Sequence, residues 1–445
     1  MDKTIAAIAT ATGGAIGVIR VSGGNAISIV NKVFSKDLET LRANSVVFGE
    51  IIDDSGEPVD QVLVTLFRAP HSYTGEDCVE ISCHGSRYIL NHVVSLLIEN
   101  GASQAGPGEF TQRAFMNGKM DLSRAEAVAD VIAAESRAAH HVAMNQLRGG
   151  FSSKLSVLRD KLLRITSLLE LELDFSDHEE LEFADRKELH SLAEEINSHI
   201  LQLLSTYKAG QAIKNGIPVA IVGKTNVGKS TLLNSLLGDE RAIVSDVHGT
   251  TRDVIEDTVQ IDGVLFRFID TAGLRHTDDA IERIGIERAY MKLSQASIVV
   301  WLIDSEPTDE ELSEMKEKCL DKQLIIVANK CDLSPTPPAS AQLSISAMQS
   351  IGIDALKKLL VSAADIPDIS TQDVIVNNAR HYDALINAQR AISRAADAFA
   401  MDLSGDLIAE DLRDCIHYLG SIVANGEIST QETLNNIFSH FCVGK

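Results

Sequence analysis

The stretch GKTNVGKST, residues 223–231, limits what this chain can fold into more than any other part of it. It follows the apolar run PVAIV and opens the helical run TLLNSLLG, so it joins a strand to a helix. Gly223, Gly228, Lys229 and Ser230 satisfy the pattern G-x-x-x-x-G-K-[ST]. Glycines let backbone N–H groups point at phosphates, the lysine charges the β and γ oxygens, and the serine hydroxyl ligates Mg²⁺. We therefore predict a nucleotide-binding α/β domain around this loop.

Two later segments match the parts of a GTPase that sense the metal and the γ-phosphate. GTTRD (249–253) offers Thr251 to Mg²⁺. DTAG (270–273) follows an apolar strand, where Asp270 can act in the metal's outer coordination sphere and the Gly273 amide can reach the γ-phosphate.

A third segment selects the base. NKCD (329–332) follows the strand QLIIVA; Asp332 can accept two hydrogen bonds from guanine, and Asn329 can face N7. Adenine lacks that donor pair, so a carboxylate there selects GTP over ATP. ISA (345–347) adds the Ala347 amide for guanine O6. The ordered set predicts a GTPase domain.

The surrounding pattern predicts the fold class. Strands alternate with helical stretches over about 216–370, which is typical of a parallel sheet with crossover helices. Apolar residues recur at helical spacing on both sides of this region, and short β-like runs fill the first 118 residues. We predict a multidomain α/β and α chain. Its domains are an N-terminal α+β domain (1–118), a discontinuous helical domain (119–214 and 372–445) and an inserted Ras-like P-loop GTPase domain (215–371).

The residue after DTAG is Leu274, where Ras-like enzymes carry the glutamine that orients the attacking water. Phosphoryl transfer needs positive charge between the β- and γ-phosphates. The amide oxygen of Asn226, inside the loop, could hold a monovalent cation there, or the residue could merely cap or turn the loop. Glu282, twelve residues past Asp270, could position the water or be a solvent-facing helix residue. The residues alone leave both alternatives open.

The net charge of the chain limits which partners it can bind by electrostatic attraction. A formal net charge of −23 argues against a basic nucleic-acid footprint, and an aromatic content of 4% offers few stacking platforms. If the protein binds RNA, we expect a partner protein or a local patch of its surface to make many of the contacts.

The six cysteines form no C-x-x-C pair and no zinc spacing, which fits a reducing cytoplasm. No apolar segment approaches 18 residues, so we expect no membrane contact and a cytoplasmic location. The opening run IAAIATATGGAIGVI is interrupted by Thr and Gly, which favours a strand and turn over a signal peptide.

Taken together, the motifs closely resemble the bacterial tRNA-modification GTPase family MnmE, also called TrmE. The resemblance runs the full length and includes IGVIRVSG, SYTGEDCVE, PGEFTQRAFMNGKMDLSRAEA, DTAGLR with IERIGIERA, and the terminal FCVGK. It implies an N-terminal folate-binding domain that forms a homodimer, and potassium-dependent pairing of the GTPase domains. It also implies work with the flavoprotein MnmG, in a heterotetramer or larger complex. Together they would add an aminomethyl or carboxymethylaminomethyl group to C5 of the wobble uridine, U34, of certain tRNAs.

The resemblance also implies site residues and cofactors: GTP, Mg²⁺, K⁺ and a reduced folate, either 5-formyl- or 5,10-methylene-tetrahydrofolate. Mg²⁺ maps onto Ser230 and Thr251, K⁺ onto Asn226, Ser245, Val247 and Thr250, and the water-orienting role onto Glu282. The expected GTP-binding residues are Asn226, Val227, Gly228, Lys229, Ser230, Thr231, Ser245, Asp246, Val247, His248, Gly249, Thr250, Thr251, Asp270, Thr271, Ala272, Gly273, Asn329, Lys330, Asp332, Ser346 and Ala347.

The folate site carries over to Arg20, Glu80, Lys119 and Lys445. A carboxylate can take the paired N–H donors of a pterin, and the cations suit a glutamate tail or polar ring edges. Without the resemblance, Arg20 is a strand-edge charge and Lys119 a surface residue at a helix start. Cys442 is expected near the folate as a reactive, catalytic thiol or as an inert tail thiol.

The chain departs from the family pattern at three places. Met348 replaces a usually basic residue, Thr225 a common proline, and the terminus reads CVGK where CIGK is commoner. None of these changes removes a group that bears a ligand. The alternative to this function is an RNA-associated regulatory GTPase that acts only as a switch, with hydrolysis indifferent to the monovalent cation. A ribosome-assembly GTPase would carry a basic RNA-binding module, and a folate-dependent aminomethyltransferase would not explain the GTPase motifs.

Overall fold

The computed structural model describes residues 3–174, 186–238, 257–269, 295–333, 336–365, 374–423, 434, 437–439 and 441–444. Its contacts define two compact units, each made of separate stretches of sequence. The first comprises Met1–Ile132, Gln146–Asn197 and Ala384–Lys445, and the second Ala133–Asn145 and Ser198–Asp383. The three domain boundaries expected from the sequence stay a prediction, because this division does not test them.

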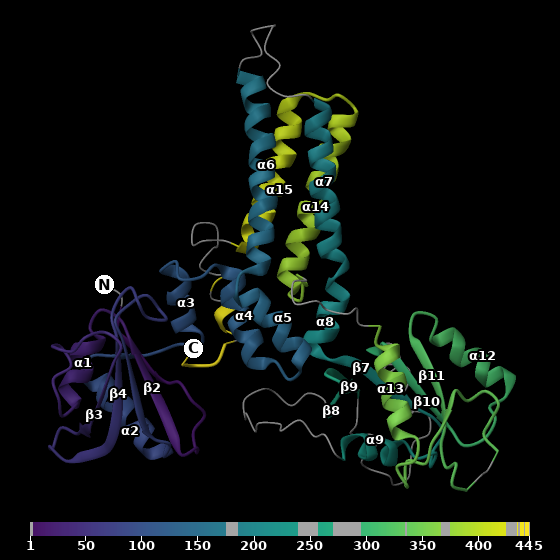
Figure 1. Ribbon diagram of the computed structural model, residues 1–445, viewed down its shortest axis with the longest axis horizontal. Helices are drawn as coiled ribbons and strands as arrows, with labels where there is room; N and C mark the ends of the chain where they lie inside the picture. Colours follow the sequence, from purple (N-terminus) through teal and green to yellow (C-terminus); the bar gives the residue numbers. More distant parts are fainter. Residues whose placement is uncertain are drawn as a thin grey trace. The chain divides into compact units, whose positions relative to one another are not determined.

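A six-stranded sheet forms the N-terminal part of the first unit, in the order β3-β4-β5-β2-β1-β6. Its pairs are antiparallel except for β1 and β6, and helices α1 and α2 pack on one face (Figure 1). On β5, Val79, Ile81 and Cys83 belong to the core beneath these helices. Because side chains alternate along a strand, Glu80 and Ser82 point to the opposite, open face. The elements are β1 (Ile5–Ile8), β2 (Ile16–Ser22), α1 (Ala26–Val33), β3 (Ser45–Ile52), β4 (Pro58–Phe67), β5 (Cys78–His84), α2 (Arg87–Glu99), β6 (Ser103–Gln104) and α3 (Glu109–Met116).

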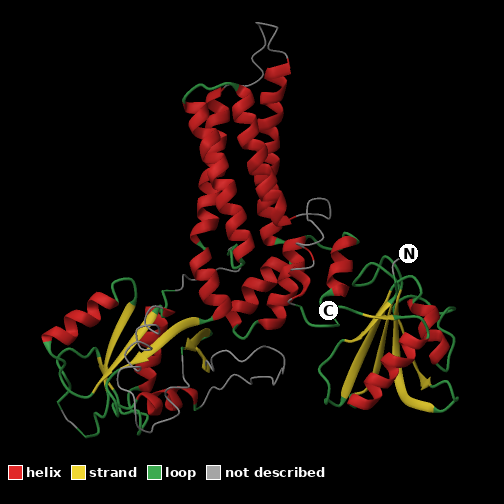
Figure 2. Cartoon of the chain, turned by 180° about the vertical axis from the view of Figure 1, so that it is seen from behind, coloured by secondary structure: helices red, strands yellow, loops and turns green. Residues whose placement is uncertain are grey.

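Long helices follow, as the apolar spacing predicted. Leu155, Leu162 and Leu169 on α6 are fully buried, and α6 packs along α15, more than 200 residues later in the chain (Figures 1 and 2). Ion pairs join neighbouring helices, such as Lys161 to Glu195 at 2.7 Å. Among the described residues, no helix is long and apolar enough to cross a bilayer. The helices are α4 (Leu122–Ala133), α5 (Arg137–Leu147), α6 (Gly150–Asp174), α7 (Arg186–Ser205), α8 (Tyr207–Asn215), α14 (Ala379–Ala400) and α15 (Gly405–Val423).

The second unit contains the predicted parallel sheet, in the order β12-β11-β10-β7-β9-β8. Only its edge strand β8 runs antiparallel to its neighbour. Apolar clusters cover both faces, one beneath α9 and α13 and the other beneath α12. Such a sheet gathers the loops that follow its parallel strands at one edge, where ligands bind. The elements are β7 (Ile217–Val222), α9 (Lys229–Leu237), β8 (Asp257–Ile261), β9 (Val264–Phe268), β10 (Ile298–Ile303), α12 (Asp309–Lys318), β11 (Gln323–Ala328), β12 (Leu343–Ser344) and α13 (Ile353–Ala363).

The packing of α13 can be tested with the chain's one tryptophan, Trp301, which is buried on β10 and reports on this sheet. Leu356 on α13 is fully buried, so Leu356→Ala should lower the free energy of unfolding by about 2–5 kcal/mol. The measurement is urea unfolding followed by Trp301 fluorescence. Lys358→Ala, two residues away at an exposed position, should change it by less than about 0.5 kcal/mol. Equal shifts in the two variants would contradict this packing.

Candidate functional site

The phosphate-binding loop lies between β7 and α9, as its sequence predicts. Gly223 and Gly228 have φ of 152° and 105°, which disfavour any side chain. A Cβ at Gly223 would also collide with the Leu302 carbonyl oxygen on β10, so the loop can pass this strand only with glycine there. Asn226 has φ of 59°, in the left-handed region that asparagine tolerates, and its side chain is exposed.

Lys229 begins α9, and its ammonium lies over the loop. Its Nζ donates to the carbonyl oxygens of Gly223 at 2.9 Å and Lys224 at 2.7 Å. Ser230 follows at the second position of the helix. The predicted phosphate and metal groups are therefore brought together at the N-terminus of α9, where the helix dipole favours negative charge.

Asn329 connects this loop to the base-binding turns. The residue is buried; its Nδ2 donates to the Val227 carbonyl oxygen at 2.7 Å, and its Oδ1 accepts from the Ala347 amide at 3.0 Å. Val227 is itself 1% exposed in the core beneath α9. The sequence predicted that Asn329 and Ala347 face the guanine, but it gave no sign that they bond to each other and to the loop.

The remaining base-site residues follow the neighbouring strands. Asp332 is exposed in the turn after β11, and Lys330 has φ of 65° with its Nζ 3.0 Å from Asp304 Oδ2. Ser346 is buried and exchanges backbone hydrogen bonds with Ile351. Asp304 follows β10, so polar groups from β7, β10 and β11 meet at one edge of the sheet.

The sequence reasoning also missed Glu311. Its Oε1 lies 2.9 Å from the Lys224 ammonium, and this hydrogen bond holds the pKa of the Glu311 carboxyl below its usual value. Glu311 also closes a capping box with Thr308 at the start of α12. The pair therefore attaches the phosphate loop to the N-terminus of α12.

Many predicted residues lie outside the described residues, and their roles stay predictions. They are Ser245, Asp246, Val247, His248, Gly249, Thr250, Thr251, Asp270, Thr271, Ala272, Gly273, Leu274, Glu282 and Lys445. Among the residues that the structure does describe, no group of three or more His, Cys, Asp or Glu side chains could hold a metal.

A second polar site lies on the open face of the N-terminal sheet. Arg20 on β2 and Glu80 on β5 are directly paired across the strands, with Arg20 Nη2 2.8 Å from Glu80 Oε1. The Arg20 guanidinium carbon lies 5.3 Å from the ring centre of Tyr73 and 5.6 Å from that of Phe110. Burial raises the pKa of the Tyr73 hydroxyl, which also hydrogen-bonds to Thr111. The site thus combines an ion pair with two aromatic rings.

The end of the chain reaches this second site. Arg20 Nη1 donates to the Gly444 carbonyl oxygen at 3.5 Å, and Val443 forms a β-bridge with Pro107. Gly444 has φ of 97°, and a Cβ there would collide with the Ile8 carbonyl oxygen. The exposed Cys442 lies in this tail, with its carbonyl oxygen bonded to the Gly108 amide. The predicted neighbourhood of Arg20, Glu80 and the C-terminal tail is therefore present in the structure.

The contacts that the structure gives for Lys119 are not with Arg20 or Glu80. It is exposed, and its Nζ donates to the Pro70 carbonyl oxygen at 2.8 Å. Pro70 begins the loop that carries Tyr73, so Lys119 supports the same loop that supplies an aromatic ring to Arg20.

Comparison with known proteins identifies the family of this chain. Residues 4–119 match the family described as the GTP-binding protein TrmE N-terminus, and residues 122–442 match the MnmE helical domain. The tRNA modification GTPase MnmE of Phocaeicola vulgatus is 52% identical over 100% of this chain and 99% of its own length. That of Bacteroides thetaiotaomicron is 53% identical over 100% of both chains. This chain belongs to the MnmE family of tRNA modification GTPases.

The predicted fold class is confirmed by this membership: a TrmE-type N-terminal domain, an MnmE helical domain and a P-loop GTPase domain. Among solved structures, the G domain of the T. maritima FeoB iron transporter covers 34% of this chain and is itself covered to 99%. The two are 23% identical with a TM-score of 0.25, which supports no further argument. The predicted enzyme class is also confirmed, and the chain is a GTPase of this family.

Asn329→Ala tests the connection inside the MnmE-type nucleotide site. The change leaves a buried carbonyl and a buried amide without partners, at about 1–3 kcal/mol each. Guanine nucleotide affinity should fall at least about tenfold, and the Trp301 unfolding transition should move to lower urea. Fluorescent GDP titration measures the first effect. Asn234→Ala, the same change at an exposed position of α9, should leave both unchanged. Wild-type GDP affinity in Asn329→Ala would show that the connection is dispensable.

Proposed function

We propose that this chain hydrolyses GTP in a potassium-dependent way to drive modification of tRNA. Together with a flavoprotein partner, MnmG, it adds an aminomethyl or carboxymethylaminomethyl group to C5 of U34 in certain tRNAs. A reduced folate supplies the one-carbon unit. The observation that carries the proposal is the Asn329 amide, which joins a phosphate loop to a guanine-selective turn in a chain whose relatives are named tRNA modification GTPases.

In this proposal the chain's own groups bind and orient GTP. Lys229 and the N-terminal amides of α9 hold the β- and γ-phosphates, and the Asp332 carboxylate accepts the guanine N1–H and amino protons. The Ser230 hydroxyl, with Thr251, suits Mg²⁺, because hydroxyl and carboxyl oxygens are its usual protein ligands. The metal would neutralise charge on the β- and γ-phosphate oxygens.

Asn226 is the residue proposed to replace the missing catalytic glutamine. Its left-handed backbone and exposed amide fit a role as an oxygen ligand on the phosphate side of the loop. With Ser245, Val247 and Thr250 it would hold K⁺, which supplies positive charge beside the transferred phosphoryl group. Glu282 would orient the attacking water.

Glu80 and Arg20 are the proposed folate anchors, with Lys119 and Lys445. The donor set fits a reduced pterin: a carboxylate for paired N–H groups, a guanidinium for a carbonyl or carboxylate, and the rings of Tyr73 and Phe110 beside them. Cys442 lies in the tail that contacts Arg20 through Gly444, which supports a thiol close to the folate.

The open face of the N-terminal sheet supports the proposed homodimer. Ile16, Val46, Phe48 and Leu63 are 67%, 61%, 55% and 47% exposed on this face. Phe48 and Leu63 are directly paired across β3 and β4. Large apolar side chains gathered on one face commonly mark an interaction site, and a second copy of the chain would bury them.

The cation requirement can be measured as steady-state GTP hydrolysis in KCl against NaCl at equal ionic strength. Wild type should be at least about tenfold faster in KCl, and Asn226→Gly should lose most of that difference. Glycine accepts the same φ, so the loss would report on the amide and not on backbone strain. GDP affinity should stay within about threefold of wild type. Equal rates in both salts would instead favour the alternative, a GTPase that acts only as a switch.

The folate anchor can be measured by calorimetry with 5-formyl-tetrahydrofolate. Glu80→Ala should abolish binding, because a pterin then has no acceptor for its paired donors, while GDP affinity stays unchanged. Glu80→Gln, which keeps the side-chain size, should also bind at least about tenfold more weakly. Glu39→Ala, at an exposed acidic position of the same domain, should bind as wild type does. Folate binding that survives Glu80→Ala would make this assignment wrong.

A further inference from the structure

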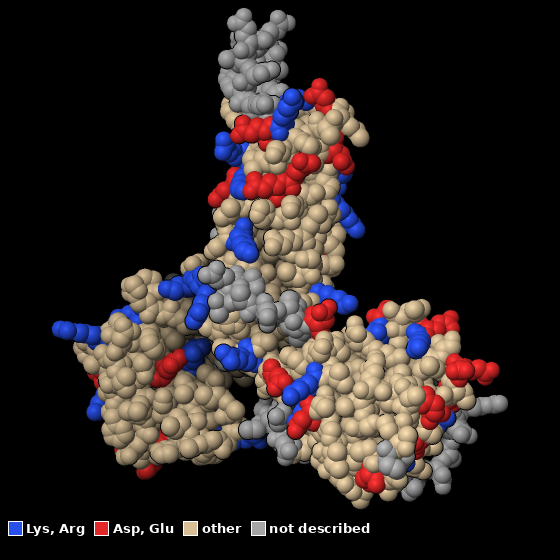
Figure 3. Space-filling model, turned by 45° about the vertical axis from the view of Figure 1, so that its right-hand side comes forward, with Lys and Arg blue, Asp and Glu red and all other residues tan. Residues whose placement is uncertain are grey.

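Charge is unevenly distributed along the long helices of the first unit. Residues 146–167, which include most of α6, carry five basic side chains and one acidic, whereas residues 168–174 carry three acidic and no basic. The antiparallel neighbour α15 shows the same division: residues 405–414 carry four acidic and one basic, and residues 415–423 carry no acidic or basic side chain except His417. In Figure 3, most of the red side chains on these helices lie over the distal part, where several blue ones are interspersed, and further blue side chains lie near the base.

Four of these cations have no partner among the residues that the structure describes. Arg148, Lys154, Arg159 and Arg164, which we call the basic belt, are exposed and form no hydrogen bond or ion pair within the described part of the chain. Basic residues of the acidic end are paired instead, for example Arg186 with Asp402 at 2.8 Å. The belt therefore presents unneutralised positive charge in a chain whose formal net charge is −23.

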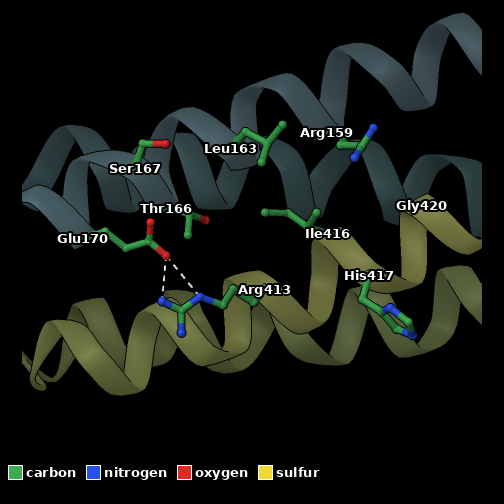
Figure 4. Close-up of a pocket in the computed structure, with 9 residues that line it drawn as sticks. All are labelled: Arg159, Leu163, Thr166, Ser167, Glu170, Arg413, Ile416, His417 and Gly420. Atoms are coloured by element: carbon green, nitrogen blue, oxygen red, sulfur yellow. Dashed lines mark hydrogen bonds and ion pairs between the residues drawn. The ribbon is translucent and has the colours of Figure 1, made fainter. Parts of the chain in front are cut away.

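A groove of about 350 Å³ between α6 and α15 lies beside the belt (Figure 4). Arg159 and His417 line one end, and the other end is closed by the ion pair of Glu170 with Arg413 at 2.6 Å. Leu163 and Ile416, from opposite helices, lie between the two ends. The open end is cationic and the closed end is neutralised, so the groove favours an anionic group at Arg159.

We propose that the basic belt is an RNA-binding surface that contacts the phosphate backbone of tRNA, with one backbone unit entering the groove at Arg159. The proposal rests on the proposed function, which supplies tRNA as the partner. Lys154 and Arg164 are ten residues apart on α6, or about 15 Å along the axis and about 80° around it. Arg159 lies between them, about 140° around the helix from each, so the belt curves around the exposed side of α6. Exposed, unpaired arginines and lysines are the groups that bind phosphate, and no aromatic platform is needed for backbone contact.

The acidic end of the same helices limits where along them a polyanion can bind. A polyanion is repelled from α6 beyond Glu170 and from the first half of α15, so RNA can approach only the base of the helices. An acidic protein surface is the competing partner for such a belt. The four cations, unpaired among the described residues, and the groove at Arg159 favour a polyanion with evenly spaced charges.

The test is binding of unmodified tRNA transcript to the full-length chain, by fluorescence anisotropy at several salt concentrations. The triple variant Lys154→Gln, Arg159→Gln, Arg164→Gln should bind at least about tenfold more weakly at about 150 mM salt. The slope of log affinity against log salt should fall by about 2–3, since each lost phosphate contact removes about 0.7–0.9. The matched control Lys36→Gln, Lys316→Gln, Lys358→Gln removes the same charge from exposed sites elsewhere and should bind as wild type does. GDP affinity checks the fold of each variant.

Equal tRNA binding by the two triple variants would overturn the belt as an RNA surface. Unchanged tRNA binding together with loss of flavoprotein co-purification in the belt variant would also overturn it, in favour of an acidic protein partner. If wild type binds no tRNA alone while the complex still modifies U34, the belt is wrong and the proposed function stands. If the complete complex modifies no tRNA, the proposed function itself fails.

Discussion

The two hydrogen bonds of the buried Asn329 amide are the interaction on which the nucleotide site depends. They join the loop after β7, the turn after β11 and the turn after β12. Each loop alone has a backbone that is free to move, and the buried Val227 carbonyl and Ala347 amide need a partner in the core. One side chain satisfies both, so the groups predicted to hold phosphate and the groups predicted to select guanine are fixed relative to each other. A guanine nucleotide then meets a preorganised site, which limits the entropy that binding must offset.

Much of this arrangement can be predicted from the sequence because it is encoded locally. The loop between β7 and α9, the turn after β11 and the apolar spacing of α6 depend on residues a few positions apart, and the structure contains each of these elements. The roles of the two loops toward GTP stay predictions. The contacts that local patterns do not report join distant positions. Asn329 and Val227 are separated by 102 residues, and Arg20 and Gly444 by 424. The first pair was missed, and only the family resemblance placed Arg20 near the C-terminal tail. No local pattern reports such pairs, because they arise from the order of strands in a sheet and from the packing of a chain end. The roles of Thr251, Asp270 and Glu282 stay predictions on motif spacing alone.

The second site follows a different principle from the first, since its parts come from the middle of a sheet and from the end of the chain. Arg20 is kept in place by Glu80, by two aromatic rings and by the Gly444 carbonyl oxygen. The tail can approach so closely only because Gly444 has no Cβ. The cysteines differ in how readily their thiols lose a proton. Desolvation raises the pKa of Cys78, Cys83 and Cys415 to about 12, which makes these thiols poor nucleophiles. Cys442, in contrast, is exposed in the tail. A reactive thiol in this protein is therefore expected at the tail and not in the core.

Both proposed polyanion partners, GTP and tRNA, must bind to a chain that is strongly acidic overall. The two proposed sites meet this requirement by placing cations locally where the polyanion would bind. At the nucleotide site, Lys229 lies at the N-terminus of α9, and the flanking Lys224 is held by Glu311 at the start of α12. The basic belt lies on the half of α6 that is beside the uncharged end of α15, with Arg148 just before the helix begins. Because exposed charges act over only about 8–10 Å at physiological salt, the distant carboxylates do not cancel these clusters. The negative net charge thus repels a polyanion from most of the surface, and the local distribution of cations decides where it binds.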